Sequence, residues 1–192
     1  MTGHINIHHD DDDDDDIRGA AELASQHAGS SGDVSLFSGI LDSLMQKKKA
    51  AEIDKDDVDE PTAIKNHKKY FDDDEDDDDD DVNERNMGTA AAIQALKTFT
   101  DHGAADASVT GGAAAPGKSQ FIGLALSEAS KLFDKQSAQG KVSSGSTKES
   151  AVMQAGEMAY KIYLKSKGDA SATGPGGGVG GLMDLMASKF MK

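Results

Sequence analysis

Two runs of consecutive carboxylates are the residues in this chain whose type and spacing could do chemistry. The first run has seven aspartates and the second has ten acids, and no basic residue interrupts either of them. Hard divalent cations prefer carboxylate oxygens, and calcium accepts irregular ligand sets more readily than magnesium does. The predicted calcium ligands in the two runs, with one acid that follows the first run, are Asp10, Asp11, Asp12, Asp13, Asp14, Asp15, Asp16, Glu22, Asp72, Asp73, Asp74, Glu75, Asp76, Asp77, Asp78, Asp79, Asp80 and Asp81.

The spacing in the first run resembles only part of an ordered calcium loop. Asp11, Asp13 and Asp15, with Glu22 seven residues further on, follow the ligand order of an EF-hand loop. However, Asp16 stands where that loop needs a glycine for its turn. We therefore expect many weak calcium sites, with dissociation constants of about 10⁻⁴ to 10⁻³ M or weaker, and no dedicated EF-hand.

The acidity of the chain is local. The runs hold 17 of the 35 acidic residues, and the remainder of the chain has 18 acids against 20 basic residues. Neighbouring aspartate side chains repel one another by about 1 kcal/mol per pair even in water. Both runs are therefore predicted to remain outside the core and outside helices, as solvated loops that gather counterions.

A second motif, from Gly112 to Ser119, matches the P-loop pattern, with Gly117 and Lys118 before the serine. A working P-loop holds phosphates between the end of a buried strand and the start of a helix. The preceding ADASVT is too polar and too short to be a central strand. We expect a loop that leads into a helix capped by Ser119 and does not hydrolyse nucleotides.

A histidine cluster precedes the first run. If Met1 is removed, His4 becomes the third residue, and the terminal amine, two amides and the imidazole suit copper(II) or nickel(II). Any histidine third from an N-terminus offers the same ligands, so the pattern is not specific.

Other functional classes are not expected. The chain has no cysteine and no G-x-S-x-G motif. Its carboxylates are abundant only in the runs, whereas a general acid needs a fixed, partly desolvated site. The runs would repel nucleic acid, and no stretch approaches the roughly 18 apolar residues of a membrane span. The prediction is a non-enzymatic protein without a transmembrane segment, located inside the cell in the cytoplasm or nucleus.

The segments between and after the acidic runs are predicted to be helical. Apolar residues recur at spacings of three and four, and no segment alternates as a strand would, which predicts an all-α fold: a small bundle of about six helices. Asp33 is the predicted N-cap of the second helix, and Ser146 with Glu149 has the spacing of a capping box for the sixth. The expected helices cover 17–28, 34–50, 59–71, 83–103, 119–140 and 148–168.

The predicted organisation places a disordered, His- and Asp-rich arm at 1–16. A helical domain follows at 17–168, interrupted by an acidic loop at 72–82 and a small-residue loop at 103–117. A Gly-rich linker at 169–181 then leads to an amphipathic helix at 182–192.

A pattern of alanine, alanine, lysine and an aromatic residue, A-x-x-x-A-x-K-x-aromatic, begins at Ala91, Ala125 and Ala155. Alanines four residues apart form a flat strip that allows another helix to approach closely. The pattern is consistent with a repeat scaffold or with a bundle whose helices have similar packing needs. The linker lengths vary, which favours the bundle.

The segment 182–192 has a broad apolar face rich in methionine, a residue common on surfaces that adapt to partners. It could dock on its own bundle, or enter a groove on another protein. The predicted partner-binding residues are Leu182, Met183, Leu185, Met186, Phe190 and Met191.

Several blocks of the chain resemble a family of fungal proteins called beta-flanking proteins. The blocks include HAGSSGDVSLFSGIL, DVDEPTAIKNHKKYF, NMGTAAAIQALKTFT and FIGLALSEASKLFDKQSAQG. The resemblance covers about two thirds of the chain and implies a fungal source and a helical body, but no activity and no catalytic residues. This chain departs from the family where the second acidic run replaces an expected Gly- and Ser-rich loop.

Two functions remain as hypotheses. The first is a non-enzymatic protein that binds calcium and other divalent cations through its acidic runs. The second is an interaction protein whose runs engage basic proteins. The first should prefer calcium over magnesium at physiological salt, whereas the second should respond mainly to ionic strength.

Overall fold

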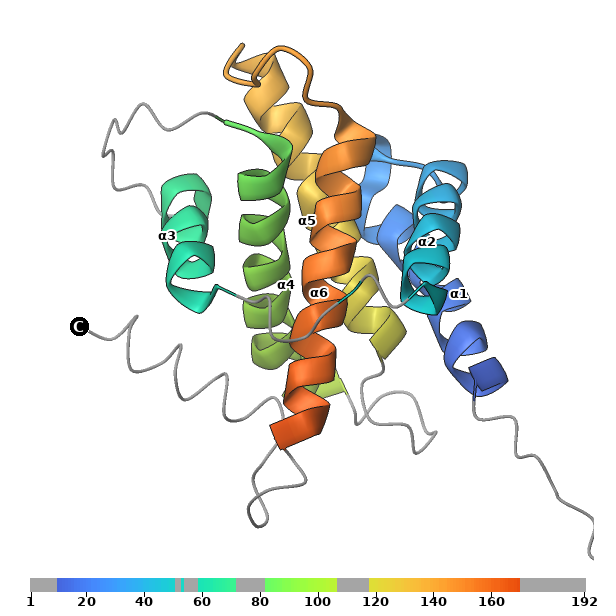
Figure 1. Cartoon of the computed structure of the whole chain (residues 1–192). Coiled ribbons are helices and arrows are strands. Elements are labelled where there is room, and N and C mark those ends of the chain that lie inside the picture. Colours follow the sequence, from blue (N-terminus) through green and yellow to red (C-terminus); the bar gives the residue numbers. More distant parts are fainter. Residues whose placement is uncertain (1–9, 51–52, 54–58, 72–81, 107–117, 170–192) are drawn as a thin grey trace, which may run out of the picture.

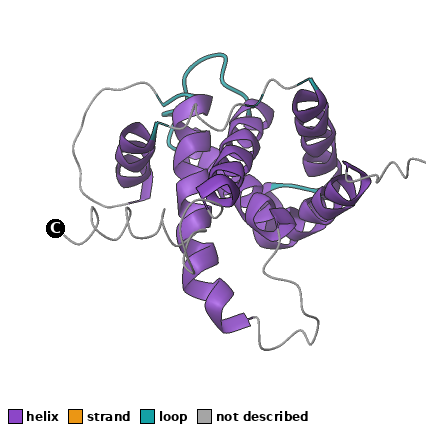
Figure 2. Ribbon diagram, turned by 60° about the horizontal axis from the view of Figure 1, so that its bottom comes forward, coloured by secondary structure: helices purple, strands orange, loops and turns teal. Residues whose placement is uncertain are grey.

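The chain folds into an all-α bundle, seen in a computed structural model that describes residues 10–50, 53, 59–71, 82–106 and 118–169 (Figure 1). Within these ranges the regular elements are helices, and no strand is present (Figure 2). The elements are α1 (Asp10–Ala28), the 3₁₀ turn η1 (Gly29–Ser31), α2 (Val34–Lys49), α3 (Glu60–Phe71), α4 (Glu84–Asp106), α5 (Lys118–Ala138) and α6 (Lys148–Asp169). The predicted fold class is confirmed.

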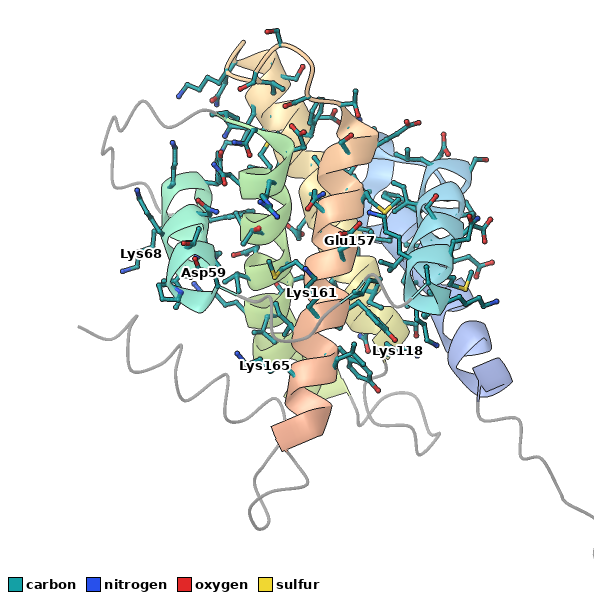
Figure 3. All side chains as sticks on the ribbon, viewed as in Figure 1. Asp59, Lys68, Lys118, Glu157, Lys161 and Lys165 are labelled. Atoms are coloured by element: carbon teal, nitrogen blue, oxygen red, sulfur yellow. The ribbon has the colours of Figure 1, made fainter. Side chains whose placement is uncertain are left out.

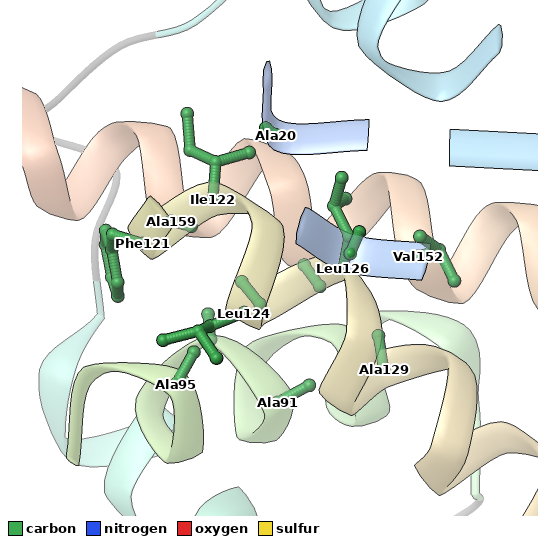
Figure 4. Packing of buried hydrophobic residues seen from close by; sticks show 14 of the residues in the cluster. Ala20, Ala91, Ala95, Phe121, Ile122, Leu124, Leu126, Ala129, Val152 and Ala159 are labelled. Carbon is green, nitrogen blue, oxygen red and sulfur yellow. The ribbon is translucent and has the colours of Figure 1, made fainter. Parts of the chain in front are cut away.

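Helix α5 lies at the centre of the bundle. It packs against α1, α4 and α6, while α3 packs on the outer side of α4 and α2 packs mainly on α1. The alanine pattern explains this arrangement, because its first two positions are fully buried in all three helices that carry it (Figure 4). These buried alanines are Ala91, Ala95, Ala125, Ala129, Ala155 and Ala159. Similar packing needs in one bundle, rather than a repeat array, account for the pattern.

Glycines allow two pairs of helices to approach even more closely. A Cβ atom at Gly123 of α5 would lie 2.9 Å from the carbonyl oxygen of Ala20 in α1. A Cβ atom at Gly88 of α4 would lie 2.8 Å from the amide nitrogen of Ala155 in α6. Real Cβ atoms do not tolerate such distances, so these positions need glycine if the helices are to keep their spacing.

The caps of α2, α3 and α4 follow ordinary side-chain chemistry. Asp33 accepts a hydrogen bond from the amide of Leu36 at 2.9 Å, which confirms the predicted N-cap. Asp59 accepts from the amide of Thr62 at 3.2 Å, and Asn83 accepts from the amide of Asn86 at 2.9 Å. These side chains satisfy amides that have no partner inside the helix.

Two predicted caps were wrong. Ser146 does not cap α6, because its hydroxyl donates to the carboxylate of Glu84. Thr147 takes the cap position and accepts from the amide of Ser150 at 3.1 Å. Helix α5 begins at Lys118, so Ser119 lies inside its first turn and is not the residue before it.

The first acidic run also differs from expectation. Helix α1 begins at Asp10 instead of Ile17, so the backbone of Asp10–Asp16 is helical and the expected solvated loop is not observed there. Carboxylates in the first turns of a helix interact favourably with the positive end of its dipole. That attraction offsets part of the repulsion between neighbouring aspartates. Helix α4 likewise continues to Asp106, past its expected end at Gly103.

No helix in the described part of the chain is both long enough and apolar enough to cross a membrane.

Candidate functional site

The residues on both sides of the second acidic run pack against one apolar cluster of the bundle. Phe71, the last residue of α3, and Val82, just before α4, both pack against one apolar cluster. We call this the loop-anchor cluster; its buried members are Tyr70, Met87, Ala90, Leu132 and Ala151. Both residues that flank the run are therefore held by the same cluster. Residues 72–81 themselves lie outside the described residues.

Hydrogen bonds also hold the residues that directly follow the second run. The amide of Ser143, in the connection between α5 and α6, donates to the carbonyl of Val82 at 3.0 Å. In the same connection, Ser146 donates to Glu84 in the first turn of α4. The backbone of Val82 and the side chain of Glu84, both close to the run, are thus tied to a segment that is distant in sequence.

A buried histidine contacts Phe71, the residue that directly precedes the second run. His67 is almost fully buried, and its ring stacks on that of Phe71 with 5.2 Å between the centroids. Its Nε2 atom lies 2.7 Å from Oε1 of Gln94 in α4. His67 therefore connects Phe71, at the end of α3, with Gln94 of α4.

Glu84 lies close to the second run, and its surroundings in the folded protein shift its pKa. The hydroxyl of Ser146, and then the backbone amide of Glu84 itself, donate to this carboxylate and hold its pKa below the ordinary value. A group with a lowered folded pKa stabilises the fold above its unfolded pKa, about 4.3 for glutamate, and this contribution is lost as the pH falls through the folded pKa.

Replacing Ser146 with alanine should therefore weaken the fold at neutral pH and make stability less dependent on pH below about 4.3. The carboxylate is partly exposed to solvent, so the expected loss is below about 1 kcal/mol. Urea unfolding at several pH values measures it. Ser144→Ala, an exposed serine in the same connection, is the matched control. An unchanged pH dependence in Ser146→Ala would show that the bond to Glu84 does not form in solution.

The first acidic run lies at the N-terminal end of α1. Its backbone forms the first turns of α1, while its side chains lie outside the described ones. Glu22 is exposed on the same helix. Because 10–28 is one continuous helix, Asp11, Asp13, Asp15 and Glu22 do not form an EF-hand loop.

Among the side chains that the structure describes, no group of three or more histidine or acidic residues could hold a metal ion. Calcium ligation by the two runs therefore stays a prediction about side chains outside the described part.

The P-loop match gains no support. Residues 107–117, which include its glycines, lie outside the described residues. Lys118 is only 4% exposed, and its Nζ lies 5.9 Å from the ring centroid of Tyr163 in α6 (Figure 3). A P-loop lysine must reach a bound phosphate, whereas this lysine packs between α5 and α6.

The sequence prediction missed the residues that close the second run: Phe71, Val82, Ser143 and Ser146. The available signal was that an aromatic residue stands directly before the run and a valine directly after it. The predicted partner-binding residues at 182–192 and the histidines at 4, 8 and 9 lie outside the described residues.

Residues 16–104 match a protein family described as Domain of unknown function (DUF7721). The match begins at the last residue of the first run and contains α2, α3, the second run and most of α4. No curated protein and no solved structure matches the chain. The matched family supplies no activity, and the central helix α5 lies beyond its limits. The resemblance to fungal beta-flanking proteins stays a prediction, because no comparison names that family.

Proposed function

We propose that this protein is a non-enzymatic helical scaffold whose two acidic runs, 10–16 and 72–81, bind divalent cations, with calcium preferred over magnesium. The closure of the second run at the loop-anchor cluster is the observation that supports this proposal. Ten acids lie between Phe71 and Val82, which pack on the same cluster. Because both ends of the run are held on the bundle, these carboxylates stay at a higher local concentration than on an open chain.

Divalent cations suit this arrangement. Mutual repulsion among carboxylates held in a small volume is relieved when a doubly charged ion sits between them. Calcium takes six to eight oxygen ligands in flexible geometry, whereas magnesium requires a near-ideal octahedron and keeps much of its water. Carboxylate-rich segments without a fixed cage should therefore favour calcium, at the weak end of the affinity range, about 10⁻⁴ to 10⁻³ M. Such sites fill only where calcium approaches millimolar concentrations.

Calorimetric titration with calcium, in about 0.15 M salt with excess magnesium, tests the proposal. The intact protein should release or absorb heat in a saturable way. Changing 72–81 to serine and glycine should remove the larger share of this binding, because this run is closed at both ends. Changing 10–16 as well should remove the remainder.

Net charge needs its own control. Asp42 and Glu149 are exposed acids outside both runs, and changing them to amides should leave calcium binding unchanged. If the intact protein gives no heat beyond that of ionic screening, calcium binding is wrong, and the runs are better explained by basic protein partners. If the Asp42 and Glu149 variant loses as much binding as the run variants, overall charge is responsible and the runs are not the site.

A further inference from the structure

Helices α2 and α6 enclose a groove whose volume is about 520 Å³. It runs beside the first half of α6, where α2 packs less extensively than it does on α1. The lining residues are Ser35, Leu36, Gly39, Ile40, Ser43 and Lys47 from α2, Glu84 from α4, and Glu149, Ser150, Met153 and Gln154 from α6.

The α2 wall of the groove is built to admit another helix. Ser35, Gly39 and Ser43 are small residues at successive spacings of four, so they lie along one line on the helix surface. A Cβ atom at Gly39 would meet no described atom within 4 Å. Leu36 and Met153 are only partly buried and offer apolar surface beside this line. A helix with an apolar face could approach here closely.

The two ends of the groove differ in charge. Lys47 forms an ion pair with Glu157 of α6 at one end. Glu84 and Glu149 line the groove near Ser35, at the other end. Because α2 and α6 both run from the Glu84 and Glu149 end towards Lys47, a helix lying in the groove would experience a charge gradient along its axis.

We propose that residues 182–192 of this chain occupy the groove as an amphipathic helix, antiparallel to α6. The connecting chain has a suitable length. Helix α6 continues for twelve residues beyond Glu157, to Asp169, which corresponds to about 18 Å. The Gly-rich stretch 170–181 has a typical end-to-end distance of about 19 Å. A segment attached through it reaches the Lys47 end of the groove without being stretched.

The length and the charges of the segment 182–192 then determine the direction in which it lies in the groove. Eleven helical residues span about 16 Å, close to the roughly 18 Å between Ser35 and Lys47 along α2. A segment that enters at the Lys47 end places Lys189 and Lys192 at the end that carries Glu84 and Glu149. On a helical projection Lys189 lies between Leu182 and Leu185 at the edge of the apolar face, whereas Ser188 lies on the opposite, outward side.

A spin label on the segment tests this placement. The chain has no cysteine, so Ser188→Cys provides a single attachment site on the outward side of the segment. In the isotope-labelled full-length chain, a nitroxide at this position should broaden the amide resonances of Gly39, Ser43 and Met153. The resonances of Ile64 in α3, on the other side of α4, should remain sharp.

Two leucine substitutions separate groove filling from other effects. Gly39→Leu puts a side chain into the groove and should reduce the broadening at Ser43 and Met153 at least about fivefold, a loss of about 1 kcal/mol of docking free energy. Leucine is also the better helix former, so α2 should remain folded. Gln46→Leu adds the same side chain at an exposed position of α2 that does not line the groove, and should leave the broadening unchanged.

A change in the segment itself leaves the described bundle intact. Lys189→Glu should reduce the broadening about two- to fivefold, as expected when attraction to Glu84 and Glu149 becomes repulsion. Absence of broadening around the groove in the unmodified full-length chain would overturn the proposal. So would broadening that appears when a spin-labelled, unenriched chain is mixed with an enriched chain without the label, because the groove would then hold a second copy.

Discussion

Replacing Gly88 with alanine should lower the free energy of unfolding by about 2 kcal/mol or more, although alanine is the better helix former by about 1 kcal/mol. The new Cβ atom would lie 2.5 Å from Cβ of Gln154 and 2.9 Å from the carbonyl oxygen of Ala151 in α6. Because backbone atoms are among these neighbours, no rotamer change relieves the overlap. Helices α4 and α6 would have to separate along a contact that is otherwise made by fully buried alanines.

Gly19→Ala is the matched control for this change. Gly19 is exposed on α1, and a Cβ atom there would meet no described atom within 4 Å. The same substitution should therefore stabilise the protein by up to about 1 kcal/mol. Urea unfolding followed by circular dichroism measures both. Equal stabilisation by the two changes would mean that α4 and α6 are further apart in solution than in the structure.

Replacing Phe37 with alanine should lower the free energy of unfolding by about 3 to 5 kcal/mol. Phe37 has no exposed surface, and its ring packs beneath the turn that joins α1 to α2, next to Gly32. Two other helices fix this turn by hydrogen bonds to the carbonyl oxygen of Ser31. Lys148 of α6 donates to it at 2.9 Å, and the hydroxyl of Ser130 in α5 donates to the same oxygen. Because these hydrogen bonds fix the turn, the cavity left by the ring of Phe37 cannot collapse fully.

For a chain of this size, a loss of that magnitude should lower the melting temperature by roughly 10 °C. Val34→Ala, a large apolar residue on the same helix that is 44% exposed, should change stability by no more than about 0.5 kcal/mol. A small effect of Phe37→Ala, similar to that of Val34→Ala, would place the ring outside the core and contradict the packing of α2 against the rest of the bundle.

The centre of the bundle could be predicted because its signal is local. Ala125 and Ala129 are spaced to form a strip within a single helix, and the structure buries both completely. Asp33 was correctly predicted as a cap because its partner, the amide of Leu36, is three residues away. Both features depend on residues within one helix or on its first turn, which is why sequence spacing was enough to predict them.

The prediction for Ser146 failed because a distant residue competes for its hydroxyl group. The hydroxyl of Ser146 has the right spacing to serve α6, yet it donates to Glu84, which arrives from α4. The candidate site shows the same limit. The acidic composition of 72–81 is evident in the sequence, but the closure of its ends depends on Leu132 of α5 and Ala151 of α6. These contacts join parts of the chain that no local spacing relates.

The anchoring of Phe71 and Val82 on one cluster has a consequence for how the sequence can change over time. When both ends of a loop are fixed at neighbouring points, doubling its length adds only about 0.6 kcal/mol of closure entropy. The number of residues between these anchors can therefore drift with little effect on the folding of the bundle.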